Sequence, residues 1–265
     1  MLLYDILVYL YDFVHALMMF RLSLPSLITL ETHFVFRRYQ TLSVQSFNNI
    51  RMRKQLLSIA NHLLLHTSFM TNLGLFYGKM GSVLFFVHYA KYTNNSIYDD
   101  FAGEILDEIY EDIHTEMPVY FSNGLSGIAW GIEYLLQQGY MEGESDEVLS
   151  DLDTKIMKWD PLRISDFTFE TGLEGIAWYV LSRLTSPRSG SIPFDDRYLR
   201  DLKTACQSSK QNSELPEGVV ALLQYMESQK VAYSFDDILE KIVLLSSKKR
   251  KEELSWQAGL KMLVK

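Results

Sequence analysis

The sequence predicts an all-α protein, an α/α toroid in which apolar inner helices are covered by amphipathic outer helices. Three observations predict this fold. A glycine-leucine motif recurs at intervals of about 50 residues, strongly apolar segments alternate with amphipathic acidic ones, and no segment alternates apolar and polar residues between hairpin turns. The sequence leaves open whether the ring of helical hairpins closes completely. An open α-solenoid is the competing architecture.

The recurring motif is the first of these observations. It begins at Gly74 (GLFYGKMG), Gly124 (GLSGIAWG) and Gly172 (GLEGIAWY), so the intervals are 50 and 48 residues. Eight of the 14 glycines fall in the three motifs, namely Gly74, Gly78, Gly81, Gly124, Gly127, Gly131, Gly172 and Gly175. Glycine at a loop that enters a helix permits close backbone packing and leaves amide N–H groups exposed. The motifs therefore predict repeated helix starts that share one rim.

The segments between and after the motifs supply the two kinds of helix. Residues 81–90 and 172–181 are apolar nearly all round, which indicates buried helices. Residues 98–116 place apolar side chains at i, i+4 spacing opposite an acidic face, and residues 146–158 repeat this pattern. An inner ring covered by an outer ring accounts for this alternation.

The domain organisation follows from a change of composition. Residues 1–48 contain no glycine and are rich in aromatic residues, leucine and methionine, so we expect an N-terminal helical extension. Residues 49–265 are expected to form the toroid domain. With 48% hydrophobic and 22% charged residues, this length suits a domain with a sizeable core.

Charge and cysteine content exclude several classes of function. The net charge of -8 argues against nucleic-acid binding, because the one dense basic run, residues 248–251, is followed at once by two glutamates. Asp5 and Asp12 interrupt the apolar stretch at residues 1–20, which argues against a membrane segment. The single cysteine, Cys206, predicts a reducing compartment, and we expect a cytoplasmic protein.

The segments GLFYGKMGSVLFFVHYAKYT and NGLSGIAWGIEYL resemble signature segments of the lanthionine synthetase C-like family, and the similarity extends over residues 55–184. The resemblance implies an α/α toroid. For full members it also implies a zinc ion, held by two cysteines and a histidine late in the chain, that activates a peptide thiolate for addition to a dehydrated serine or threonine. Here Cys206 is the only cysteine and no histidine follows His114. We therefore expect a diverged member that acts in the modification of ribosomally made peptides, either as a diverged enzyme or as a zinc-free component that binds a peptide. No metal and no other cofactor is expected.

The candidate binding residues lie in the motifs or a few residues before or after them. We expect a peptide substrate, or a peptide-maturation enzyme, at the end of the toroid where the motif loops converge, and backbone N–H groups there suit an anion. The candidate residues for this contact are Tyr77, Lys79, Asn123, Ser126, Trp130, Glu133, Thr171, Glu174 and Trp178.

Two functions of other classes remain open. The first is a carbohydrate-active enzyme that uses two carboxylates such as Glu133 and Glu174. The second is an interaction scaffold without catalysis.

His88 lies within an apolar helix and is expected to be a hydrogen-bonded core residue. His62 and His66 are four residues apart but lack an evident third metal ligand, so we expect ordinary helix histidines.

Overall fold

The computed structural model describes residues 47–187, 190, 192–208, 215–249 and 253–264. The chain divides into two compact units, 1–54 and 55–265, and the elements from η1 to α12 all belong to the second. Most of the expected N-terminal extension, residues 1–46, lies outside the described residues, so the expectation for it stays a prediction.

The described part of the chain is helical and contains no strand. A helix over residues 47–66 buries Leu56, Ile59 and Leu63. It is followed by η1 (Thr67–Phe69), α3 (Lys79–Thr93), α4 (Ile97–Asp112), α5 (Leu125–Gln137), α6 (Ser145–Val148), α7 (Ser150–Met157), η2 (Pro161–Arg163), α8 (Leu173–Thr185), α9 (Asp196–Ser208), α10 (Glu217–Ser228), α11 (Phe235–Lys249) and α12 (Trp256–Leu263). The prediction of an all-α, toroid-type fold is confirmed.

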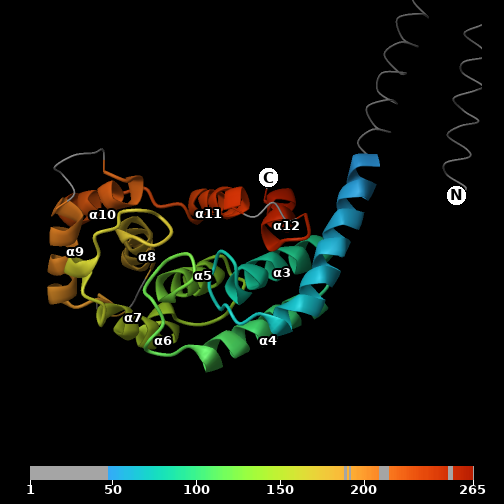
Figure 1. Cartoon of the computed structure of the whole chain (residues 1–265), viewed down its shortest axis with the longest axis horizontal. Helices are drawn as coiled ribbons and strands as arrows, with labels where there is room; N and C mark the ends of the chain where they lie inside the picture. The colour runs from blue at the N-terminus through green and yellow to red at the C-terminus, as the bar shows by residue number, and fades with distance from the viewer. Residues whose placement is uncertain (1–46, 188–189, 191, 209–214, 250–252, 265) are drawn as a thin grey trace, which may run out of the picture. The chain divides into compact units, whose positions relative to one another are not determined.

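The inner layer consists of α3, α5, α8, α10 and α12. Consecutive members pack side by side from α3 to α10, and α12 returns to pack against α3 (Figure 1). Glycines permit these close approaches: a Cβ atom on Gly218 of α10 would meet Trp178 of α8, and one on Gly259 of α12 would meet Phe85 of α3. The contact between α12 and α3 brings the last helix of the chain back to the first inner helix.

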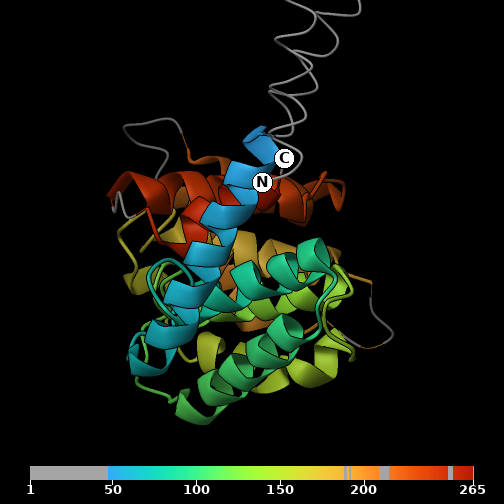
Figure 2. The ribbon, with the colours of Figure 1, turned by 90° about the vertical axis from the view of Figure 1, so that its right-hand side faces the viewer.

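The outer layer consists of α4, α6, α7 and α9. Figure 2 shows α4 running alongside α3, against which it packs. Its buried residues Ala102, Ile105 and Ile109 face inward at helical spacing, while acidic residues face solvent. The segment expected as one helix at 146–158 is broken at Leu149 into α6 and α7. There the Ser150 hydroxyl donates to the Glu147 carbonyl and offers the backbone an alternative to the helical pattern.

Helix α11 departs from the alternation of inner and outer helices. It lies between α10 and α12 in the ring (Figure 1) and packs against α12. Its side chains also reach α5 and α8: Phe235 contacts Trp130, and Lys241 contacts Glu174. We call the side of α5 and α8 that these residues contact the interior. Aromatic side chains fill the space between α11 and α5.

Candidate functional site

The same turn precedes α3, α5 and α8. The first helical N–H group of each donates to the carbonyl seven residues earlier, from Lys79 to Asn72, Leu125 to Pro118 and Leu173 to Asp166, each at 2.9 Å. The residue before each helix is glycine, and a Cβ atom on it would lie 2.0 to 2.4 Å from that same carbonyl oxygen. The backbone therefore leaves no room for a side chain at this position.

This geometry corrects the alignment of the first motif. The glycine equivalent to Gly124 and Gly172 is Gly78, which caps α3, and not Gly74. Gly74 lies four residues earlier, and its missing Cβ makes room for Asn123, whose Cα would be only 2.3 Å away. The intervals between equivalent positions are thus 46 and 48 residues.

The loops before α3, α5 and α8, residues 70–78, 113–124 and 164–172, form a shared edge that we call the rim. Phe76 N–H donates to the Ser122 carbonyl at 2.7 Å, and Ser122 N–H donates to the Glu170 carbonyl at 2.9 Å. From α12, Trp256 and Gln257 donate through their side chains to the Phe76 carbonyl. The glycine-marked helix starts therefore converge, as the sequence predicted.

A cavity of about 450 Å³ opens at this edge, and we call it the rim pocket. It is lined by Thr71, Asn72, Leu73, Asp112, His114, Met117, Pro118 and Asn123. Leu73 and Met117 are buried and supply an apolar floor, whereas Asp112, His114 and Asn123 are exposed. Of the nine candidate binding residues, only Asn123 lines this pocket.

Thr171 is also on the rim, but its hydroxyl is committed within the loop. It donates to Asp166, which also accepts from the side chain and the backbone of Thr168. Although burial alone raises the pKa of Asp166, the hydrogen bonds from Thr171 and Thr168 hold that pKa below its usual value. This group therefore shapes the third rim loop.

Four candidate residues are enclosed within the helical layers or the loop. The Lys79 ammonium donates to Glu108 of α4 at 2.7 Å, which joins the inner and outer layers. Ser126 and Glu133 are both 0% exposed. Tyr77 is partly buried, and its ring packs edge-on against Phe76. None of these four side chains lines the rim pocket.

Trp130, Glu174 and Trp178 face the interior, where they meet the segment that leads into α11. The Trp130 indole donates to the Tyr233 hydroxyl at 2.6 Å, and the Trp178 ring packs against Tyr233. Burial raises the pKa of Tyr233 well above its usual value, so its hydroxyl keeps its proton. The two tryptophans at equivalent motif positions are thus brought together by a tyrosine from a distant part of the chain.

The partner of Glu174 is Lys241 of α11, which the sequence analysis did not single out. Its ammonium donates to Glu174 at 2.7 Å and to Glu217 at 3.2 Å. It also lies 5.0 Å from the centre of the Phe169 ring and 5.8 Å from that of Trp178. Lys241 and Glu174 are 67 residues apart, so no local pattern points to this pairing.

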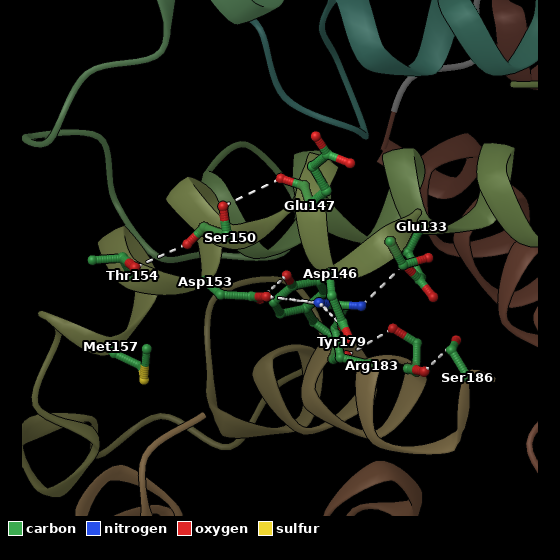
Figure 3. A network of polar contacts seen from close by, with 12 residues as sticks. Glu133, Asp146, Glu147, Ser150, Asp153, Thr154, Met157, Tyr179, Arg183 and Ser186 are labelled. Atoms are coloured by element: carbon green, nitrogen blue, oxygen red, sulfur yellow. Dashed lines mark hydrogen bonds and ion pairs between the residues drawn. The ribbon is translucent and has the colours of Figure 1, made fainter. Parts of the chain in front are cut away.

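A second ion cluster lies between α5, α6, α7 and α8 (Figure 3). Arg183 donates to Asp153 at 2.9 and 3.2 Å and to Asp146 at 3.0 Å, and its guanidinium lies 3.5 Å from Glu133. Tyr179 donates to the other oxygen of Asp153. Burial raises the pKa of Asp153, even though Arg183 and Tyr179 oppose that shift. Arg183, Asp153 and Glu133 are buried and Asp146 is partly exposed, so the cluster joins the inner and outer layers beneath the surface.

His88 is hydrogen-bonded, as expected for a core histidine. Its Nε2 lies 2.8 Å from the Tyr134 hydroxyl, and its Nδ1 lies 3.3 Å from that of Tyr140. Burial, and to a smaller extent the charge of Lys91, lowers the pKa of His88 to about 4. The imidazole is therefore neutral at neutral pH, with a tyrosine at each ring nitrogen.

The residues present do not fit the zinc site of full family members. That site takes two cysteines and a histidine, and the sequence has one cysteine. Cys206 is buried in α9, and burial raises the pKa of its thiol to about 12, whereas a metal ligand must be a thiolate. Across residues 47–264, masked positions aside, no three His, Cys, Asp or Glu side chains gather where they could hold a metal ion.

Together the layered helices, the glycine-bounded turns and the shared rim define an α/α toroid protein. Residues 70–260 match the lanthionine synthetase C-like family, and the chain belongs to that family. No curated protein and no solved structure matches the chain. Within the described segments, no helix has both the length and the apolar character needed to cross a membrane.

Proposed function

We propose that this protein binds a peptide in the rim pocket, without zinc, and acts as a binding component in the modification of ribosomally made peptides. The observation that carries the proposal is the rim pocket itself. Its volume of about 450 Å³ falls within the usual range for ligand sites, and its lining combines five polar side chains with the apolar residues Leu73, Met117 and Pro118.

The polar groups of the pocket suit a polypeptide backbone. The side-chain oxygen of Asn72 accepts from Gly74 N–H at 2.8 Å, and that of Asn123 accepts from the Ser122 hydroxyl at 3.3 Å. Each amide oxygen is thus used within the rim, which directs the NH₂ donor elsewhere. Donors of this kind bind peptide carbonyls, while Leu73 and Met117 receive an apolar side chain.

Charge at the pocket edge favours a cationic peptide. Asp112 lies at the edge, and the neighbouring residues Glu111 and Glu116 are exposed as well. The whole chain carries a net charge of -8. Electrostatic complementarity of this kind contributes chiefly to association rate and specificity.

The geometry gives no support to a carbohydrate-active enzyme. Glu133 is 0% exposed, accepts from Gln137 at 3.1 Å and is paired with Arg183. Glu174 is held by Lys241. A general acid and base must reach the scissile bond from a site that a sugar can enter. Both carboxylates are instead committed to cations of the protein.

The test is selection of short random displayed peptides on the purified protein, followed by calorimetry with the selected sequences as synthetic peptides. We expect Asn123→Leu to weaken binding by about tenfold, because it removes the amide donor without adding a charge. Asn61→Leu makes the same change on the exposed surface of the helix at 47–66 and should leave the affinity unchanged. A chelator should have no effect on the wild-type affinity.

Equal affinities for the wild type and Asn123→Leu would contradict binding in the rim pocket and favour the scaffold alternative. Loss of binding in chelator would contradict the zinc-free proposal. Matching unfolding midpoints of the two variants serve as the control for folding.

A further inference from the structure

The ammonium of Lys241 contacts four side chains that come from other elements of the fold. Its ammonium nitrogen lies 2.7 Å from Glu174 in the first turn of α8 and 3.2 Å from Glu217 at the first residue of α10. The rings of Phe169 and Trp178 lie within 6 Å of the same nitrogen, the range in which an aromatic face attracts a cation. We call these four residues the ammonium cage.

The four residues of the ammonium cage all lie outside α11, the helix that carries Lys241. Phe169 belongs to the third rim loop, Glu174 and Trp178 to α8, and Glu217 to α10. Helices α8 and α10 pack directly against each other. The walls are therefore positioned by hairpins that do not depend on the Lys241 side chain, which is the condition for a preformed binding site.

A second observation points to a ligand at the cage. Trp178 is 6% exposed, and its indole N–H group is buried without a hydrogen-bond partner in the described part of the chain. A buried donor left unpaired costs free energy, so such a group invites an acceptor. A lysine residue of a polypeptide brings an ammonium and backbone carbonyl oxygens together, whereas the Lys241 side chain supplies only the ammonium.

We propose that Phe169, Glu174, Trp178 and Glu217 form a binding site for the lysine side chain of a partner polypeptide, and that Lys241 occupies this site as an internal ligand. The incoming lysine replaces Lys241 and makes the same two ion pairs and the same two contacts with aromatic faces. The cage shares no residue with the rim pocket, so this inference does not rest on the proposed function.

The experiment removes the Lys241 side chain from the cage and then adds a lysine compound in solution to take its place. In Lys241→Ala, we expect Nα-acetyl-lysine methylamide to raise the unfolding midpoint in a saturable way, and the norleucine analogue, which lacks the ammonium, to have no effect. The lysine compound should bind more tightly than n-butylammonium, which has no carbonyl oxygen for Trp178. Adding Glu174→Gln should weaken binding by about tenfold, because a charge-assisted hydrogen bond is lost.

The controls separate the cage from a general response to amines. Lys261→Ala removes an exposed lysine from α12 and should respond to the two amines no more than wild-type protein does. Wild-type protein should respond less than Lys241→Ala, because Lys241 competes for the cage. If butylammonium and the lysine compound bind equally, the role given to the polypeptide carbonyl is wrong.

A folded Lys241→Ala protein that responds equally to the lysine and norleucine compounds would overturn the proposal. If Lys241→Ala is unfolded in buffer, circular dichroism follows its refolding instead. The lysine compound should then restore helix, and a failure to restore it also overturns the proposal. Because no peptide of the display library is used, failure here is distinct from failure of the rim-pocket test.

Discussion

The two ion clusters of this toroid use the same chemistry in different surroundings. Arg183 is 1% exposed and meets three carboxylates between the helical layers, whereas the side chain of Lys241 is 26% exposed and meets two carboxylates beside aromatic rings. The partners of Arg183 come from both layers, so the cluster joins them. The carboxylate partners of Lys241 come from α8 and α10, so its loss would leave those walls in place.

The contribution of each cluster to the free energy of unfolding depends on how deeply its charges are buried. Breaking a fully buried ion pair leaves an uncompensated charge that water cannot reach. A partly exposed pair is weakened by solvent, and its loss is largely offset by hydration. We therefore interpret the Arg183 cluster as a structural element and the Lys241 cluster as an exchangeable one.

The largest effect is expected for Arg183→Met. This change removes the cation that lies beside Asp153 and Glu133 while retaining apolar bulk. We expect the free energy of unfolding to fall by about 3–5 kcal/mol, measured by urea denaturation. Arg197→Met removes an exposed arginine from a 3.7 Å pair with Asp201 and should cost under about 0.5 kcal/mol. Equal losses in the two variants would show that the Arg183 cluster is not enclosed.

A second prediction tests how tightly the backbone of α5 packs against the rim. A Cβ atom on Gly127 would lie 1.8 Å from the Phe121 carbonyl oxygen, which cannot move without shifting the rim. Gly127→Ala should therefore lower the free energy of unfolding by about 3 kcal/mol. Gly103 in α4 has nothing within 4 Å of its Cβ position, so Gly103→Ala should raise stability by about 0.5–1 kcal/mol. The same sign for both variants would contradict the close packing at the rim.

The layered fold was predictable because its signals are local in sequence. Glycine before an apolar helix and acidic residues along one face of the next helix both lie within short windows. The register of the first motif was wrong because GLFYGKMG contains glycines four residues apart, and only the hydrogen bond from Lys79 to Asn72 identifies Gly78 as the cap. Helix α9 was missed in a polar stretch, although Tyr198, Leu202 and Cys206 have helical spacing and are buried.

The candidate site was less predictable because its contacts join distant parts of the chain. Trp130 and Trp178 were singled out from their equivalent motif positions, but nothing nearby in sequence indicates Tyr233 as their partner. Glu133 was chosen as a carboxylate near a motif loop, yet its cation is 50 residues away on α8. The one available signal was Arg183 itself, a charge within an apolar helix that must find a buried partner.

The smallest effect is expected for Lys241→Met, which removes the ammonium and keeps an unbranched apolar side chain. Because Lys241 is partly exposed, we expect the free energy of unfolding to fall by about 1 kcal/mol or less, well below the loss for Arg183→Met. The difference between wild type and Lys241→Met should shrink as sodium chloride is added, since salt screens a solvent-accessible pair. The loss in Arg183→Met should respond far less, because ions do not reach that cluster. A Lys241→Met protein as unstable as Arg183→Met, and equally insensitive to salt, would place both cations in the same structural role and would remove the reason to regard the ammonium cage as exchangeable.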